Sequence, residues 1–167
     1  ITAAGKINDG VDLESSSSQG FYNDSAPPSG TYGASDSTSC CLWFKPESLS
    51  AGQSIFNIQN RTSTNGNQRR LNMYVNTDGT LVGMAGNGTT LYTATTGNAV
   101  SVGTFSFMQA EVVPGGSLRA RINDGTWASA VGPNASVTSS LSVRIGLNRR
   151  TGSVVNELFA DGIIDEV

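Results

Sequence analysis

Histidine is absent from this 167-residue sequence, and charged residues are scarce. Without histidine, the chain holds neither a Ser-His-Asp or Cys-His catalytic centre nor a histidine-based metal site. Charged residues make up 14% and the net charge is −3, so no basic stripe is available and we expect no nucleic-acid partner. No run of about 18 apolar residues occurs, so we expect no membrane insertion.

Cysteine is nearly absent as well, with Cys40 and Cys41 as adjacent residues. Neighbouring side chains on a strand point in opposite directions, so this pair cannot close a relaxed disulfide. We therefore expect two free thiols.

The clearest pattern that is present lies in residues 105–131. Apolar residues alternate with polar ones at 108–112 and again at 118–122, with Arg119 and Arg121 on the polar side. This period of two predicts strands with one buried and one solvent-exposed face. Pro114-Gly115-Gly116 and Asn123-Asp124-Gly125 tolerate the positive φ of tight turns. The segment therefore predicts three strands joined by two turns.

Similar short strands are expected along the rest of the chain. A strand over 39–45 is apolar on both sides, which predicts a central strand covered on both faces. In 71–75, Asn72 and Tyr74 are expected to point outward. Further strands are predicted at 5–13, 20–22 (an edge strand), 53–59, 81–85, 91–93, 140–147 and 158–167. Residues 1–167 therefore predict a single all-β domain, a sandwich of two antiparallel sheets.

Four segments occur in an order that resembles a known family: 4–8 (AGKIN), 42–46 (LWFKP), 143–146 (VRIG) and 159–167 (FADGIIDEV). They resemble the laminin G-like members of the concanavalin A-like jelly-roll superfamily. The resemblance implies a jelly-roll sandwich whose first and last strands are adjacent. It also implies a domain that binds rather than catalyses, as in adhesins, accessory modules of polysaccharide enzymes and bacteriophage structural proteins. We expect the domain to belong to a larger chain or assembly.

Catalysis is not expected. Laminarinase-type relatives carry acidic residues at alternate positions of one strand, which puts two carboxyl groups on one face. The close acidic pair found here, Asp165-Glu166, has neighbouring positions that face opposite ways.

One structural calcium ion is implied by the resemblance, with Asp165 in the closing strand as a ligand. Calcium takes six to eight oxygen ligands, which backbone carbonyls near 5–8 would help to supply. The alternative is that Asp165 caps backbone amides of a loop.

Arginines and aromatic residues are the candidate ligand-binding groups. Guanidinium groups suit carboxylates or sulfates on an acidic glycan, or the carboxylates of a protein partner. Aromatic rings suit the C–H faces of sugars. Ordinary solvated charge and core packing are the respective alternatives. The predicted ligand-binding residues are Arg61, Arg69, Arg70, Tyr74, Trp127, Asn148, Arg149 and Arg150.

The expected function is recognition, by a module displayed outside the cell or on a virion surface. It would bind glycan or another cell-surface polymer. The alternative is a structural virion protein, such as a capsid decoration or tail component, that contacts neighbouring protein subunits.

Overall fold

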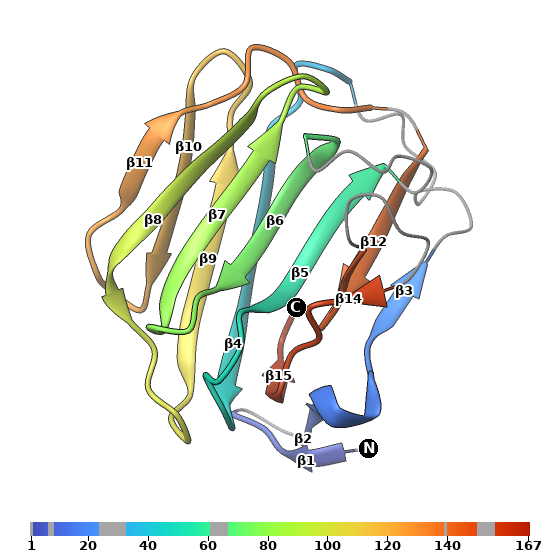
Figure 1. The fold of residues 1–167 in the computed structure, drawn as a ribbon. Coiled ribbons are helices and arrows are strands. Elements are labelled where there is room, and N and C mark those ends of the chain that lie inside the picture. Colours follow the sequence, from blue (N-terminus) through green and yellow to red (C-terminus); the bar gives the residue numbers. More distant parts are fainter. Residues whose placement is uncertain (1, 7–8, 24–32, 61–66, 139, 150–155) are drawn as a thin grey trace.

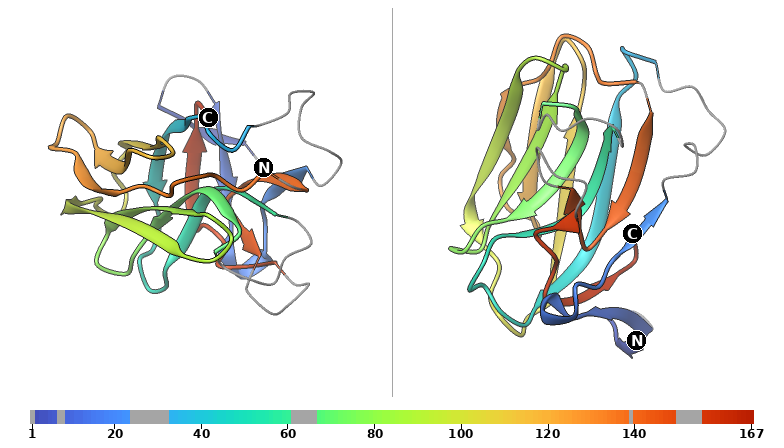
Figure 2. Two further views of the ribbon diagram at one scale, coloured as in Figure 1. Left: turned by 90° about the horizontal axis from the view of Figure 1, so that it is seen from above. Right: turned by 45° about the vertical axis from the view of Figure 1, so that its right-hand side comes forward.

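The computed structural model describes residues 2–6, 9–23, 33–60, 67–138, 140–149 and 156–167. These residues form fifteen strands and one short 3-10 helix, η1 (Ser15–Ser17). Most of the strands build two antiparallel sheets that lie face to face (Figures 1 and 2). The described residues contain no helix long and apolar enough to cross a membrane. The predicted all-β jelly-roll sandwich is confirmed.

The seven-stranded sheet contains both the start and the end of the described chain (Figure 1). Its last strand, β15, pairs with β2 on one side and β4 on the other. Strand β2 corresponds to the strand predicted at 5–13, so that opening strand and the closing strand are adjacent, as predicted, while β1 pairs with the other side of β2. In sheet order the strands are β1 (Thr2–Ala4), β2 (Asp9–Leu13), β15 (Gly162–Asp165), β4 (Thr38–Pro46), β9 (Ser106–Val112), β10 (Ser117–Ile122) and β11 (Ala128–Val131).

The six-stranded sheet begins at an edge strand that follows η1. This strand, β3, confirms the edge strand predicted at 20–22. Strands β13 (Asn148–Arg149) and β14 (Asn156–Glu157) pair with each other in a separate two-stranded antiparallel sheet. In sheet order the six strands are β3 (Phe21–Asn23), β12 (Leu141–Ile145), β5 (Gln53–Asn60), β6 (Arg69–Val75), β7 (Thr80–Gly86) and β8 (Leu91–Ala99).

The three-stranded segment predicted from 105–131 is present as β9, β10 and β11. Residues of β9 and β10 alternate strictly between buried and half-buried, and Ala110 faces Ala120 across the ladder. Gly115 and Asn123 adopt positive φ angles of 73° and 52° in the two turns, as glycine and asparagine can. The predicted strand at 5–13 is different: it begins at Asp9 and pairs with β1, while residues 7–8 lie outside the described part.

Strand β4 is central in its sheet, as predicted, but only one of its faces is covered. Leu42 and Phe44 have no exposed surface, whereas Cys41 is exposed and Trp43 is half-buried. The prediction of two covered faces is wrong because no second layer of the described chain lies against the outer side of this sheet. Large apolar residues at outward positions mimic a doubly buried strand in the sequence.

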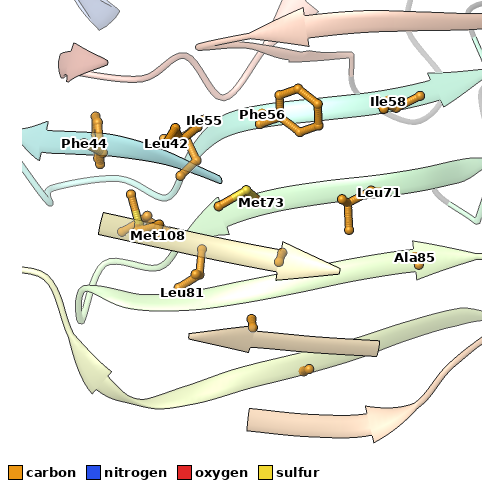
Figure 3. Packing of buried hydrophobic residues seen from close by; sticks show 14 of the residues in the cluster. Leu42, Phe44, Ile55, Phe56, Ile58, Leu71, Met73, Leu81, Ala85 and Met108 are labelled. Carbon is orange, nitrogen blue, oxygen red and sulfur yellow. The ribbon is translucent and has the colours of Figure 1, made fainter. Parts of the chain in front are cut away.

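The core fills the space between the two sheets. It consists of inward-facing aliphatic, methionine and phenylalanine side chains from both layers (Figure 3). Each such side chain stabilises the fold by about 1.5–3 kcal/mol through its removal from water. Figure 3 labels ten members of this cluster: Leu42, Phe44, Ile55, Phe56, Ile58, Leu71, Met73, Leu81, Ala85 and Met108.

Candidate ligand-binding face

Trp43 and Phe107 form the centre of an accessible aromatic surface on the seven-stranded sheet. Each adjoins an inward-facing neighbour with no exposed surface, Leu42 and Met108 respectively, so strand alternation turns both rings outward. Trp43 faces Phe107 across the β4–β9 ladder. Their ring centroids are 5.1 Å apart and their planes are tilted by 48°. Tilted ring pairs attract each other, so the two rings hold one another in position.

Two lysines lie against this surface. Lys6 Nζ is 5.2 Å from the centroid of the Trp43 ring, and Lys45 Nζ is 5.4 Å from that of Phe105. The backbone N–H of Lys6 donates a hydrogen bond to Asp165 Oδ2 at 2.7 Å, which fixes the backbone of this lysine beside the sheet. Because a ring face attracts a cation, the positive charges remain next to the rings.

Trp127 lies on the same side of the sheet, against two arginines of β10. The Cζ atoms of Arg119 and Arg121 are 4.7 and 4.6 Å from the centroid of its ring. Arg119 Nη2 forms an ion pair with Glu111 Oε1 at 2.9 Å, and Arg121 Nε donates to Gln109 Oε1. Both partners stand directly opposite on β9. The ring therefore rests on side chains that are themselves fixed by cross-strand contacts.

Two depressions open beside these rings. One, of about 390 Å³, is lined by Trp43, Phe107, Asn123 and Asp124. The other, of about 240 Å³, is lined by Trp127 together with residues of β4 and β9. Rings that offer apolar surface next to amide and carboxyl groups suit a ligand with both C–H faces and hydroxyl groups. We call this surface the aromatic face; it consists of Lys6, Cys41, Trp43, Lys45, Phe105, Phe107, Gln109, Glu111, Arg119, Arg121, Asn123, Asp124 and Trp127.

Arg70, one of the predicted ligand-binding residues, is instead part of the interior. Its side chain has no exposed surface. Its Nε donates to Thr38 Oγ1 at 2.7 Å, and its Nη atoms donate to the backbone carbonyls of Gly33, Asp36 and Val137 at 2.8–3.2 Å. Arg70 therefore closes one end of the sandwich and offers no guanidinium surface to a ligand, which corrects its predicted role.

The other predicted residues of the six-stranded sheet lie away from Trp127. Arg69 Nη1 contacts Met84 Sδ at 3.4 Å, and burial lowers the pKa of its guanidinium below the ordinary value. Tyr74 is half-buried on β6. Four predicted residues have side chains outside the described part of the structure: Arg61, Asn148, Arg149 and Arg150.

Sequence reasoning identified Trp127 but missed the two arginines that hold it. Arg119 and Arg121 alternate with buried residues of β10, and this pattern alone placed them on the outer face. The missing step was the turn after β10, which brings the chain back so that Trp127 lies over that strand. The contact could have been predicted from the sequence pattern of two alternating arginines, a turn and then a tryptophan.

Part of the outer face of the six-stranded sheet, over β5, β6 and β12, is polar and yet buried, whereas β8 carries exposed residues. Asn72 lies opposite Asn57 across the β5–β6 ladder, and neither side chain has exposed surface. Ser54 Oγ donates to Asn72 Oδ1 at 3.0 Å, and Asn57 Nδ2 donates to Gln59 Oε1 at 2.9 Å. Asn72 therefore points outward, as predicted, but meets other polar groups instead of water.

Arg144 extends this closed polar surface onto β12. It is 2% exposed, its Nε donates to Ser142 Oγ at 3.1 Å, and its Cζ lies 5.7 Å from the ring centroid of Tyr22. Buried polar groups are stable only when they are hydrogen-bonded to one another. We call this surface the polar face; it consists of Ser54, Asn57, Gln59, Asn72, Ser142 and Arg144.

A third cluster is acidic. Asp12, Glu14 and Glu47 bring carboxylate oxygens within 4.8 Å of one another. Burial raises the pKa of Glu47, and the negative charges of Asp12 and Glu14 raise it further. The sequence indicated only the neighbouring pair Asp165-Glu166 and did not reveal this cluster, to which Asp12 and Glu14 contribute from β2 and the residue after it, and Glu47 from the end of β4, on the other side of β15. Carboxylate oxygens are the ligands that calcium prefers, although a complete site needs six to eight of them.

Asp165, the predicted calcium ligand, lies at a different place on the same sheet. It is 7% exposed, stands opposite Trp43, and accepts the Lys6 backbone N–H. This contact is the one expected if Asp165 caps a loop amide. A calcium ion at Asp165 stays a prediction.

The fold is shared with several sugar-binding proteins of low sequence identity. The CBM40 of the Ruminococcus gnavus IT-sialidase, bound to α2,3-sialyllactose, has a TM-score of 0.71 and 19% identity, covering 99% of this chain and 88% of that one. Domain 4 of AbnA, a GH43 extracellular arabinanase of Geobacillus stearothermophilus in complex with arabinotriose, has a TM-score of 0.68 and 21% identity, with coverages of 99% and 71%.

A viral protein shares the fold as well. Tailspike protein 2 of bacteriophage CBA120, in its enzymatically active domain, has a TM-score of 0.63 and 14% identity. The match covers 98% of this chain but only 26% of the tailspike chain. Among curated protein sequences, none matches this chain significantly.

Sequence similarity at the family level spans most of the chain. The family model described as the concanavalin A-like lectin/glucanases superfamily matches residues 18–167. The matched range includes the six-stranded sheet, the seven-stranded sheet except β1 and β2, and all of the aromatic face except Lys6. This chain belongs to the concanavalin A-like lectin/glucanase superfamily.

Proposed function

We propose that this protein is a non-catalytic recognition module that binds a glycan on its aromatic face. The observation that carries the proposal is the placement of Trp127 and Trp43 beside two open depressions, each ring next to cations and hydrogen-bonding groups. Half-buried rings at outward strand positions offer flat apolar surface that needs no rearrangement before binding. Support also comes from two relatives of the same fold that hold sialyllactose and arabinotriose.

The aromatic face is preferred over the polar face for a physical reason. Groups of the polar face such as Asn57 and Asn72 have no exposed surface and hydrogen-bond within the protein. A ligand there would first have to break these contacts, whereas a ligand on the aromatic face displaces only water. We place the module outside the cell or on a virion surface, where such polymers are met.

A glycan array tests this proposal directly. The wild-type protein should bind a restricted set of glycans, and Trp127→Ala should weaken that binding by about tenfold or more, as loss of a central aromatic contact does. Phe21→Ala is the matched control, because Phe21 is an exposed ring (53%) on β3, outside the aromatic face. Equal binding by wild type and Trp127→Ala would contradict the proposed site. Release of reducing ends from a bound polysaccharide would contradict the non-catalytic assignment.

The second candidate function is a structural component of a virion, which the fold shared with the bacteriophage tailspike favours. Under this alternative, the aromatic face contacts neighbouring protein subunits. Absence of any array binding, combined with incorporation of the protein into a particle, would replace the glycan proposal with this one.

A further inference from the structure

The two depressions of the aromatic face adjoin one another along β9. Phe107 lines the first, and Gln109 and Glu111 line the second. Outward side chains of a strand follow each other at about 7 Å, since each residue advances the chain by about 3.4 Å. Phe107 and Gln109, which line different depressions, are successive outward positions of β9. One ligand can therefore occupy both.

The two tryptophans stand diagonally across this surface. Trp43 is level with Phe107, whereas the arginines under Trp127 are level with Gln109 and Glu111, two to four residues further along β9. From β4 to β10 the sheet spans two strand spacings, about 10 Å, so the diagonal comes to about 12–17 Å. That distance exceeds the width of one sugar ring, so a single sugar cannot contact both tryptophans.

Positive charge accompanies both ends of the diagonal. Lys6 and Lys45 lie at the Trp43 end, and Arg119 and Arg121 lie at the Trp127 end. These are four of the ten basic residues of a chain whose net charge is −3. Among the described residues, Arg119 forms an ion pair with Glu111 on this face. The charge of Lys45 acts on Glu47, which follows the end of β4. Acidic groups of a ligand would meet cations at either end.

We propose that the ligand of the aromatic face is an extended linear polysaccharide with acidic groups, which crosses β9 diagonally and stacks on Trp43 at one end and Trp127 at the other. This inference rests on the proposed function and adds the class of glycan and its mode of binding. A terminal-sugar ligand would need only one of the two rings. A neutral polymer would offer no charged group to the lysines and arginines at the two ends of the diagonal.

Oligosaccharide ladders of increasing length test the inference by calorimetric titration. The probes are oligogalacturonates, hyaluronan and heparin fragments of two to eight sugars, with arabino-oligosaccharides as the neutral control. For at least one acidic ladder, affinity should rise about a hundredfold from the disaccharide to the length that reaches both rings, and then level off. Affinity for the longer fragments should fall as salt is raised, because exposed charges are screened.

Two variants show whether both rings take part. Trp43→Ala and Trp127→Ala should each lower affinity for the long acidic fragments by about tenfold or more and flatten the dependence on length. Phe21→Ala should change neither. Thermal melting of each variant separates loss of binding from loss of folding, and Trp43→Phe keeps a ring where Trp43→Ala proves unstable.

The possible failures can be told apart. Equal affinity for short and long fragments, or an effect of only one tryptophan, would overturn the extended ligand and leave glycan binding in place. Preference for the neutral ladder would overturn the acidic ligand. Absence of binding to every ladder and to the array would overturn both the inference and the proposed function.

Discussion

The two outer faces of the sandwich present side chains of opposite accessibility. On the aromatic face, Trp43 and Trp127 are half-buried and lie beside open depressions. On the polar face, Asn57 and Asn72 have no exposed surface although they also occupy outward strand positions. The same alternation of residues thus produces an accessible surface in one sheet and a buried polar cluster over part of the other. Outward direction and solvent exposure are separate properties.

The arginines make the contrast sharpest. Arg119 on the aromatic face is 40% exposed and forms a single ion pair. Arg70 and Arg144 of the six-stranded sheet are 0% and 2% exposed and donate hydrogen bonds to groups within the protein. The exposed arginines are available for ligands, whereas the buried ones stabilise the fold. Substitutions should therefore separate binding from stability according to the sheet that they affect.

The largest effect is expected at Arg70. Arg70→Ala removes four hydrogen bonds that join the start of β6 to the segments before β4 and β12. It leaves buried carbonyl groups without their donor, so the free energy of unfolding should fall by about 3–5 kcal/mol. Urea denaturation measures this loss. Arg119→Ala, the matched control, should cost less than about 1 kcal/mol; equal losses in the two variants would remove the contrast.

Arg144→Ala should have the second largest effect. The variant loses the hydrogen bond from Nε to Ser142 and the packing of the guanidinium against Tyr22. A buried hydrogen bond of a charged donor contributes about 1.5–3 kcal/mol, so urea denaturation should show a loss in that range. Glycan binding should be unchanged at temperatures where the variant is folded. A loss of binding by the folded variant would show that the polar face takes part in recognition.

The sequence predicted the fold well because the physical signals of the fold are local. Alternation in β9 and β10 and the glycine and asparagine turns are visible in a few neighbouring residues. The site was less predictable, because it depends on contacts between strands. Trp127 contacts Arg119 and Arg121 because a turn brings the chain back over β10. Asp12 and Glu47 come close because β15 pairs with both β2 and β4 and so places these two strands in one sheet.

The error at Arg70 has the same origin. In the sequence, Arg69 and Arg70 look alike, as two neighbouring charges at the end of a polar loop. The ladder between β5 and β6 is irregular at this point, where Ile58 pairs with Leu71 and Gln59 with Arg69. Such an irregularity re-aims a side chain, and Arg70 accordingly lies inside, against Thr38. No local pattern reveals a shift of register.

Two smaller effects should distinguish the two faces: a substitution on the polar face should lower stability alone, and one on the aromatic face should mainly lower glycan affinity. Asn72→Ala leaves the buried hydroxyl of Ser54 without its acceptor, so the free energy of unfolding should fall by about 1–2 kcal/mol with no change in glycan affinity. Trp127→Ala should lower glycan affinity but cost less than about 1 kcal/mol of stability, because the ring is only half-buried. Denaturation and array binding, measured on both variants, check the pair. The comparison fails if Asn72→Ala weakens binding or Trp127→Ala leaves it intact.

The smallest effect is expected at the acidic cluster of Asp12, Glu14 and Glu47, which lies in the same sheet as the aromatic face. Burial and the charges of Asp12 and Glu14 raise the pKa of Glu47 in the folded protein. A raised folded-state pKa means that the folded chain binds this proton more tightly than the unfolded chain, so ionisation of Glu47 destabilises the fold. As the pH rises, the free energy of unfolding of the wild-type protein should therefore begin to fall at the pKa that Glu47 has in the unfolded chain. The fall should be complete above the pKa that Glu47 has in the folded protein.

Glu47→Gln removes that loss, because glutamine carries no charge at any pH. Since Glu47 is largely exposed, the gain should be only a few tenths of a kcal/mol near neutral pH, and it should vanish below about pH 4. Denaturation curves between about pH 4 and pH 8 measure it, with Glu166→Gln as a control outside the cluster. A bound cation would reverse the sign, because the carboxylate would then be a ligand; destabilisation by Glu47→Gln in the presence of calcium, abolished by chelator, would show that the cluster holds an ion.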